Sequence, residues 1–189
     1  MNFCCQCGSK VCIKVPDGDN LPRHVCVNCN YIHYQNPKVV AGCLASYEDK
    51  VLLCKRAIEP QRGLWTLPAG FMENGESTRQ AALRETQEEA CAEVEIHDLY
   101  TLTSIKHISQ IQMIYRATLN HPIYGAGEET LETRLFAEQD IPWQQLAFQT
   151  IEQALKFFFE DRKTGDYPIR HVDLDRSTSQ RTHLNNKLK

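Results

Sequence analysis

The sequence predicts a mixed α/β sandwich that is preceded by a small zinc ribbon. Two Cys-x2-Cys pairs lie within the first 29 residues, and this spacing predicts the ribbon. Beyond them, strand-like runs are interrupted by two separated helical segments, an order typical of an α/β sandwich. We expect a zinc ribbon over residues 1–34, a main α/β domain over residues 35–160 and a tail of unknown role over residues 161–189.

The composition is that of an ordinary globular protein and excludes several classes. Of the 189 residues, 42% are hydrophobic and 24% are charged, which excludes wholesale disorder. A net charge of -3 excludes a strongly basic nucleic-acid binder and argues against nucleic acid as a partner. No apolar run approaches the ~18 residues of a membrane span, and the N-terminus lacks the pattern of a secretory signal. We expect a cytoplasmic protein without a membrane partner.

The predicted zinc ligands are four paired cysteines. They are Cys4, Cys7, Cys26 and Cys29. A two-residue spacer lets both thiolates of one turn reach a single ion, and two such turns complete the tetrahedral sulfur shell that zinc prefers. Strand-like runs at 11–13 and 24–26 flank a turn-rich segment between the pairs. A closed shell leaves no position for water, so this zinc is expected to be structural.

Other cysteines and one histidine are weaker candidates. Cys5, Cys12 and His33 lie near the paired positions and rank below them as ligands. Cys43, Cys54 and Cys91 stand in apolar surroundings, and we expect them to pack in the core.

Periodicity and turn residues place the elements after the ribbon. Strands are expected at 39–47 and 51–56, forming a hairpin, and a shorter one at 64–69. A loop at 70–75 leads to a helix that begins near Ser77 and runs to about Cys91. Further strands are expected at 94–105, 110–119 and 132–136, the last after an acidic loop that starts at Gly125. A second helix is expected from 146 to about 161, and the residues beyond it lack clear periodicity.

The strongest chemical signal is an acidic cluster on the first of these helices. Glu85, Glu88 and Glu89 stand at i, i+3 and i+4, so their carboxylates share one face. Oxygen ligands of this kind select a hard divalent ion such as Mg²⁺ or Mn²⁺. Glu76 and the carbonyl of Gly70 reach the same patch if the loop folds back.

Arg84 is adjacent to the cluster in sequence but points about 100° round the helix. From there its guanidinium can pair with Glu76 or orient a metal-binding carboxylate.

The order of these residues resembles the Nudix box. Gly70, five residues, Glu76, seven residues, Arg84-Glu85 and then Glu88-Glu89 form the pattern, and residues 64–70 lead into it as in Nudix hydrolases. The cysteine region and residues 33–40 resemble the subgroup with an N-terminal zinc ribbon, whose plant plastid relatives hydrolyse FAD and ADP-ribose. The resemblance covers roughly residues 3–160 and implies a Nudix-type α/β/α sandwich with a mixed sheet.

The chain departs from the family pattern near the end of the box. Cys91 stands where a glycine is usual, and Thr86 and Ala92 replace aliphatic residues. Glycine permits a helix-ending conformation with positive φ, so Cys91 predicts a different helix exit.

The resemblance implies Mg²⁺-dependent hydrolysis of the diphosphate bridge in a nucleoside diphosphate linked to another moiety. FAD or ADP-ribose is favoured, with release of AMP. It implies that the metal ligands are Gly70, Glu85, Glu88 and Glu89, and that Arg84 and Glu76 belong to the catalytic set. The general base is either Glu85 or a carboxylate outside the box, for which the Glu128–Glu129 pair is the candidate, with Glu129 assigned to the catalytic set.

Substrate contacts are expected from the strand before the box and from the box itself. Lys55 and Arg56 can both meet the diphosphate, and Arg56 is preferred because a guanidinium binds phosphate bidentately. Trp65 and Phe71 can stack on a base, although core packing is the more common role of such residues.

Two other functions remain open. One is a pyrophosphatase acting on NADH or a nucleotide sugar, but the Ser-Gln-Pro-Trp-Pro-Phe run of the NADH group is absent. Many ADP-ribose hydrolases have a proline where this chain has Ile108, which shifts the balance slightly toward FAD. The other is a nucleotide sensor that uses the ribbon as a binding module. A homodimer is also possible.

Overall fold

The computed structural model describes residues 1–175, and its contacts separate residues 1–37 from the rest of the chain. The first of these, the N-terminal unit, is a three-stranded antiparallel sheet in the order β1-β2-β3. Its strands are β1 (Val11–Lys14), β2 (Arg23–Cys26) and β3 (Ile32–His33).

Few side chains are buried in the N-terminal unit. They are Cys4, Pro16, Val25, Cys26 and His33. So small a set cannot supply a hydrophobic core for about 35 residues, which need a metal or another crosslink to hold a fold.

The rest of the chain, the main unit, contains a mixed eight-stranded sheet. Its central order is β10-β5-β4-β9-β8-β11, while β6 pairs with β5 and β7 pairs with β4. The pairs β4–β9 and β8–β11 are parallel, and the other pairs are antiparallel. The strands are β4 (Lys38–Tyr47), β5 (Lys50–Arg56), β6 (Trp65–Thr66), β7 (Ala69–Phe71), β8 (Val94–Ile105), β9 (Gln110–Leu119), β10 (Thr130–Phe136) and β11 (Arg170–Leu174).

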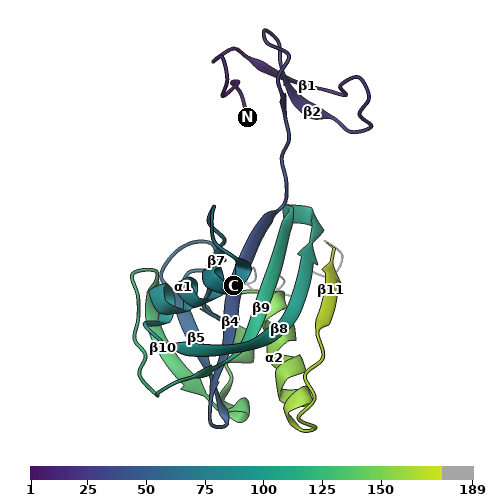
Figure 1. Cartoon of the computed structure of the whole chain (residues 1–189). Helices are drawn as coiled ribbons and strands as arrows, with labels where there is room; N and C mark the ends of the chain where they lie inside the picture. The colour runs from purple at the N-terminus through teal and green to yellow at the C-terminus, as the bar shows by residue number, and fades with distance from the viewer. Residues whose placement is uncertain (176–189) are drawn as a thin grey trace, which may run out of the picture. The chain divides into compact units, whose positions relative to one another are not determined.

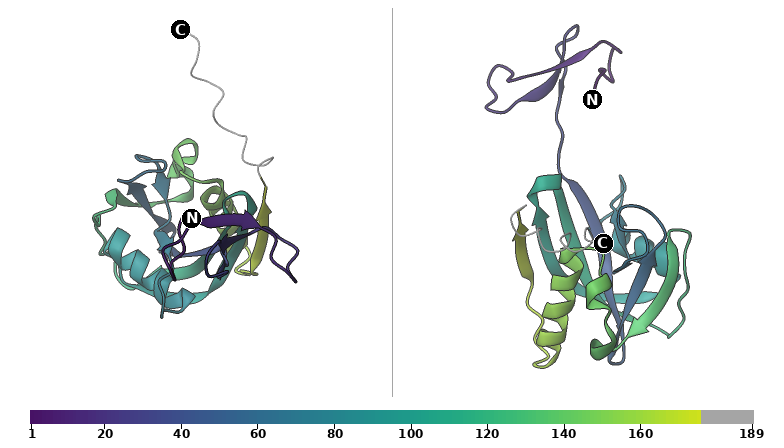
Figure 2. Two further views of the ribbon diagram at one scale, coloured as in Figure 1. Left: turned by 90° about the horizontal axis from the view of Figure 1, so that it is seen from above. Right: turned by 180° about the vertical axis from the view of Figure 1, so that it is seen from behind.

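Two helices cover the opposite faces of this sheet, as Figures 1 and 2 show. Helix α1 (Thr78–Ala90) packs small alanines on one face, and α2 (Gln149–Arg162) packs large apolar side chains on the other. Neighbouring strand residues alternate between the two cores: Cys43 lies on the α1 side and Leu44 on the α2 side. The predicted α/β/α sandwich with a mixed sheet is confirmed.

Most of the expected elements are present with small shifts. The expected strand at 64–69 is two short strands, β6 and β7, and the second helix begins only at Gln149. Short 3₁₀ turns occupy Lys106–Ile108, Glu138–Asp140 and Trp143–Gln145. Within residues 1–175, no helix has the length and apolar character to cross a bilayer.

Helix α1 begins with a capping box and ends in a left-handed residue. Ser77 accepts a hydrogen bond from the Gln80 backbone, and the Gln80 side chain accepts one from the Ser77 backbone. Cys91 adopts φ 47° and ψ 35°, and its N–H donates to the Gln87 carbonyl at 3.0 Å. The expectation of a different helix exit is therefore wrong, because Cys91 takes the conformation that glycine would take. Its side chain is exposed, so the expected core position for this cysteine is also wrong.

The end of the described chain is more ordered than its sequence indicates. Residues 161–175 belong to the expected tail without periodicity, but α2 continues to Arg162 and β11 pairs in parallel with β8 at the edge of the sheet (Figure 2). The buried Asp161 carboxylate ties them together, since it accepts hydrogen bonds from Tyr100 on β8 and Arg170 on β11. The remainder of the predicted tail, residues 176–189, lies outside the described residues.

Candidate active site and zinc centre

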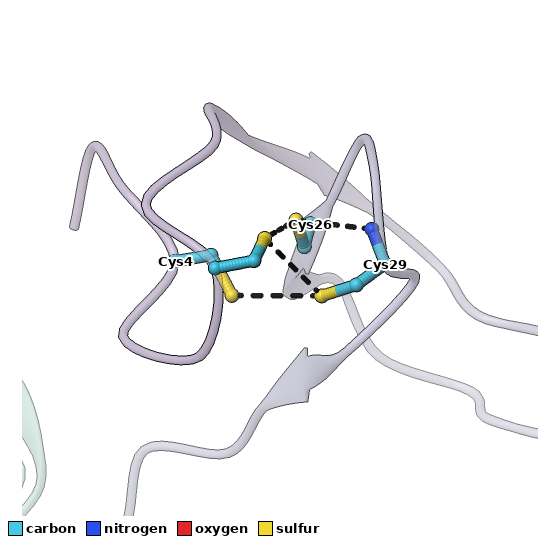
Figure 3. A group of neighbouring side chains, drawn as sticks. Cys4, Cys26 and Cys29 are labelled. Carbon is cyan, nitrogen blue, oxygen red and sulfur yellow. Dashed lines mark hydrogen bonds between the residues drawn. The ribbon is translucent and has the colours of Figure 1, made fainter.

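The four paired cysteines converge in the N-terminal unit. The Sγ atoms of Cys4, Cys7, Cys26 and Cys29 all lie within 4.8 Å of one another. Figure 3 shows the side chains of Cys4, Cys26 and Cys29 turned toward a common centre. The Cys4–Cys29 pair is separated by 3.8 Å, and the Cys7–Cys26 and Cys7–Cys29 pairs by 3.5 Å. A tetrahedral zinc with Zn–S bonds of ~2.3 Å requires sulfur atoms about 3.8 Å apart, so the residues fit the ion.

Backbone N–H groups donate hydrogen bonds to three of these sulfur atoms, whereas hydrogen bonds from the neighbouring cysteines raise the pKa of the fourth, Cys29, to about 12. Gln6 donates to Cys4 at 3.4 Å, and Asn28 and Cys29 both donate to Cys26 at 3.4 Å. Hydrogen bonds from Ser9 lower the pKa of the Cys7 thiol to about 6. Such donors stabilise the deprotonated ligands that zinc binds.

The weaker zinc candidates lie outside this cluster. The Cys5 Sγ lies 3.8 Å from the Nδ1 of His33, and Cys12 is exposed on β1. In the main unit, Cys43 and Cys54 are buried, and burial raises their thiol pKa values to about 11 and about 12. Those two cysteines pack in the core, as their apolar surroundings indicated.

In the main unit, α1 presents its acidic face to β7. The Glu85 carboxylate lies directly against the backbone of Gly70, where a Cβ would stand 2.3 Å from its carboxyl carbon. Any side chain at this position would therefore displace Glu85. Glu89 is 8% exposed, and its Oε2 accepts a hydrogen bond from the Ala69 N–H at 3.0 Å. The strand and the helix thus fix two carboxylates beside each other.

Arg84 joins the acidic residues of the loop and the helix. Its guanidinium donates to both carboxylate oxygens of Glu76, at 3.1 and 2.8 Å, and to the Phe71 carbonyl at 3.0 Å. Its second terminal nitrogen donates to Glu85 at 2.8 Å and to Glu88 at 3.0 Å. These contacts hold Glu76 ionised, since the hydrogen bond from Arg84 lowers the pKa of that carboxyl group.

The buried carboxylates carry charge that the protein compensates only in part. Burial raises the pKa of Glu89 to about 7, and the nearby charges of Glu85 and Glu129 act in the same direction. Burial also raises the pKa of Glu85, against the effect of Arg84. A divalent cation bound by oxygen ligands would offset this desolvation and repulsion, so the donor set fits Mg²⁺ or Mn²⁺.

The acidic loop is packed onto the end of α1. The Gly127 N–H donates to the Glu89 carbonyl at 3.1 Å, and the Gly125 N–H donates to the Ala90 carbonyl at 2.8 Å. A Cβ at residue 127 would stand 1.7 Å from the Glu88 carbonyl oxygen, so only glycine fits. This contact brings Glu129 into the site, where its charge raises the pKa of both Glu85 and Glu89. Glu128 lines the same cavity.

The acidic face forms one wall of a cavity of about 1750 Å³. Arg56 also lines it, and its positive charge acts on Glu89. Lys55 is not part of the wall: its ammonium pairs with Glu132 at 3.9 Å. Phe71 is 50% exposed on the cavity, so core packing is excluded for it, whereas Trp65 is buried against Phe136.

The structure thus brings together most of the residues that the sequence singled out, and it adds others. Glu76, Arg84, Glu85, Glu88, Glu89, Glu129, Gly70, Arg56 and Phe71 lie in or against one wall. Sequence reasoning missed Gln112, Phe148 and Gln153, which line the same cavity. No sequence signal marked Gln112, because it lies with Gln110, Arg116 and Thr118 on the mostly polar side of β9.

Comparison with known proteins places the chain in a family. The model described as NUDIX domain matches residues 36–165, and the zinc-ribbon model described as Nudix N-terminal matches residues 2–35. A crystal structure of a NUDIX hydrolase from Nitrosomonas europaea is 52% identical, with a TM-score of 0.91, and the match covers 93% of this chain and all of that one.

Curated relatives match over smaller parts of their length. An NAD-capped RNA hydrolase from Schizosaccharomyces pombe is 25% identical over 179 residues, covering 88% of this chain and 45% of the relative. An ADP-ribose pyrophosphatase from Methanocaldococcus jannaschii is 39% identical over 59 residues, covering 31% of this chain and 35% of the relative. The chain thus spans less than half the length of both relatives. The domain matches and the shared fold show that the chain belongs to the Nudix hydrolase family and carries that family's N-terminal zinc-ribbon domain.

Proposed function

We propose that the protein is a Mg²⁺- or Mn²⁺-dependent hydrolase of the diphosphate bridge in a nucleoside diphosphate linked to a second moiety, with release of AMP. The observation that carries this proposal is the acidic face of α1 on one wall of a large cavity, beside Arg56. Carboxylates suit a hard cation, and a guanidinium suits the phosphates that such a cation accompanies.

Each residue of the wall has a proposed task. Glu85, Glu88 and Glu89, with the Gly70 carbonyl, would hold the divalent ion, which neutralises phosphate charge and acidifies water when bound. Arg56 binds a phosphate of the bridge. Glu129 or Glu85 takes the proton from the attacking water.

Arg84 acts as a positioning residue in this proposal. Its hydrogen bond lowers the pKa of Glu76, and it fixes the orientation of the Glu85 and Glu88 carboxylates through hydrogen bonds of 2.8 and 3.0 Å. Each of these bonds uses one oxygen of its carboxylate, and an ionised carboxylate has a second oxygen that a cation can bind. Arg84 can therefore keep both contacts while the metal is bound.

ADP-ribose and FAD are the favoured substrates. The cavity, at about 1750 Å³, has room for a substrate with groups on both sides of the bridge. A dinucleotide of the NAD type is the second candidate, because the relative whose match spans 88% of this chain is named an NAD-capped RNA hydrolase. The ribbon zinc has a structural task in either case.

Product analysis with purified, zinc-loaded protein tests this function. ADP-ribose, FAD, NADH, nucleotide sugars and nucleoside triphosphates are each incubated with Mg²⁺, and the products are separated. We expect AMP from one of the first three far above the rest. If none of the compounds turns over while zinc is retained, the hydrolase proposal fails and a nucleotide-sensing role replaces it.

A further inference from the structure

The lining of the cavity includes four side-chain amides from β9 and α2 in addition to the acidic wall. We call this part the amide arm, and define it by Gln110 and Gln112 on β9 and by Gln149 and Gln153 on α2. Gln112 has the same strand parity as Ile114, whose side chain belongs to the core on the α2 side. Gln149 and Gln153 share one face of α2 by their spacing, and they line the same cavity as the β9 pair.

The amide arm carries little net charge. The charged residues that α2 contributes to the cavity wall, Glu152 and Lys156, form an ion pair at 2.5 Å. An arm of this kind suits a neutral hydrogen-bonding group better than a second phosphate chain. The charges needed for phosphate stand at the other end, at Arg56 and the acidic wall.

Two of these amides have buried oxygen atoms without a hydrogen-bond donor in the described part of the chain. Gln112 is only 8% exposed, and the Oε1 atoms of Gln112 and Gln153 are buried without a hydrogen bond among residues 1–175. A buried acceptor left in this state costs about 1–3 kcal/mol, and folded proteins contain few of them. A Gln amide can turn about its last side-chain bond, so it can present either end to a ligand in the arm.

We propose that the amide arm holds the nucleobase of the substrate, and that Gln112 and Gln153 bond the polar edge of a purine. This inference rests on the proposed function. An amide offers a donor and an acceptor side by side, the arrangement that matches the amine and ring nitrogen of adenine. The half-exposed Phe71 on the same cavity supplies an aromatic face for stacking, whereas the ring of Phe148 lies under the Arg56 guanidinium at 5.3 Å.

Binding of three nucleotide fragments to the zinc-loaded full chain tests the proposal without any need for hydrolysis. The probes are AMP, purine riboside 5′-monophosphate, which lacks the exocyclic amine, and ribose 5-phosphate, which lacks the base. The variants are Gln112→Met, of similar shape but without the amide, and Gln145→Met as a control. Gln145 is exposed and does not line the cavity.

We expect the wild type to bind AMP about tenfold more tightly than purine riboside 5′-monophosphate. Gln112→Met should lose that preference while its affinity for ribose 5-phosphate stays unchanged, and Gln145→Met should behave as the wild type. The melting temperature of Gln112→Met should equal or exceed that of the wild type, because a buried unpaired acceptor is gone. A residue with a structural role would lower it.

Several outcomes overturn the proposal. They are no AMP binding by the wild type at millimolar concentration, no preference for AMP over the analogue, or a Gln112→Met variant that keeps the preference. A variant whose affinity falls equally for all three ligands would also contradict it.

These outcomes separate the inference from the proposed function. A wild type that hydrolyses ADP-ribose but shows no Gln112-dependent preference removes only the inference. If the wild type hydrolyses none of the compounds but the Gln112→Met variant loses the preference for AMP, the base-binding proposal stands and the hydrolase proposal fails. For an active enzyme, Gln112→Met should raise KM for ADP-ribose and leave kcat within about twofold.

Discussion

The guanidinium of Arg84 and the buried carboxylate of Glu89 show how single residues shape the acidic wall. Arg84 donates hydrogen bonds to Glu76, Glu85 and Glu88, so three carboxylates are fixed around one guanidinium group. Among residues 1–175, the Glu89 carboxylate has no contact with Arg84 and accepts one hydrogen bond, from the Ala69 N–H. Its raised pKa, about 7, reflects burial with little compensation. Groups of this kind concentrate at functional sites.

Replacement of the proposed metal ligands should remove hydrolysis and leave the fold intact. Glu88→Gln and Glu89→Gln each keep the side-chain shape, and the new amide in Glu89→Gln retains an oxygen that can accept from the Ala69 N–H. We expect kcat/KM for the best substrate to fall at least about 100-fold, more than the loss typical for a residue that only supports a ligand.

The matched control for this pair is Glu95→Gln, an exposed glutamate on β8 away from the cavity. Circular dichroism checks that all three variants are folded. Turnover near that of the wild type in both Glu88→Gln and Glu89→Gln would contradict the proposed metal site.

At the scale of elements, both helices depend on how they end. Helix α1 ends at Cys91, which is held in a left-handed conformation that costs an L-residue about 1–2 kcal/mol. Helix α2 ends where Asp161 receives the Tyr100 hydroxyl at 2.7 Å and the Arg170 guanidinium. One end is strained and the other is anchored, and each can be tested by a single substitution.

Cys91→Gly should stabilise the main unit. Glycine removes the left-handed strain but adds freedom to the unfolded chain, so the net gain in the free energy of unfolding is about 0.5–1 kcal/mol. Urea denaturation of the zinc-loaded protein measures it. Cys91→Ala, which keeps a Cβ, should show no such gain. A glycine variant no more stable than the alanine variant would contradict this account of strain at Cys91, because both variants lack the thiol.

Tyr100→Phe should destabilise the main unit by about 1.5–3 kcal/mol, since a hydrogen bond to a charged group is lost in a buried place. Burial and the bond to Asp161 both raise the pKa of the Tyr100 hydroxyl, so it stays a donor at neutral pH. Tyr167→Phe is the control, because its ring packs nearby and no hydrogen bond of its hydroxyl is part of the network. Equal stability of the two variants would count against the anchoring role of Asp161.

For the whole molecule, two metals should serve the two units independently. The N-terminal unit buries few side chains and gathers four thiols, whereas the main unit has two apolar cores of its own. Zinc should therefore be required for the fold of the first unit only, and Mg²⁺ for turnover in the second.

Elemental analysis should find one zinc per chain in protein purified without chelators, and Cys26→Ser should retain little or none. A strong zinc chelator should make residues 1–37 sensitive to protease while the main unit stays resistant. Cys12→Ser is the matched control and should keep its zinc. Careful preparations that contain no zinc would overturn the ribbon assignment.

The sequence predicted best what is encoded locally. The helix start at Ser77 follows from a capping box within four residues, and the strands at 94–105 and 110–119 follow from long alternation. Strand β11 was missed because five residues at a sheet edge carry little periodic signal, and its place depends on the distant contact between Arg170 and Asp161.

The residues of the candidate site also fall into those that local sequence could place and those that depend on distant contacts. The shared face of the α1 glutamates could be derived from helix geometry, whereas the pairing of Arg84 with Glu76 depends on the loop before α1 and was one of two alternatives. Gln112 could not be placed in the cavity without α2 opposite it. At Cys91, tertiary contacts from the loop at Gly125 outweighed the local preference against a left-handed residue.

Gly70 and Gly127 make the acidic wall unusually sensitive to amino-acid substitution. At Gly70 a carboxylate occupies the place where a Cβ would stand, and at Gly127 a backbone carbonyl does. At residue 127 even the methyl group of alanine would meet the backbone of α1, whereas at residue 70 it would displace the flexible carboxylate of Glu85. In a complete substitution scan, we expect every replacement at these two positions to reduce activity sharply, whereas replacements at neighbouring positions should reduce it by degrees.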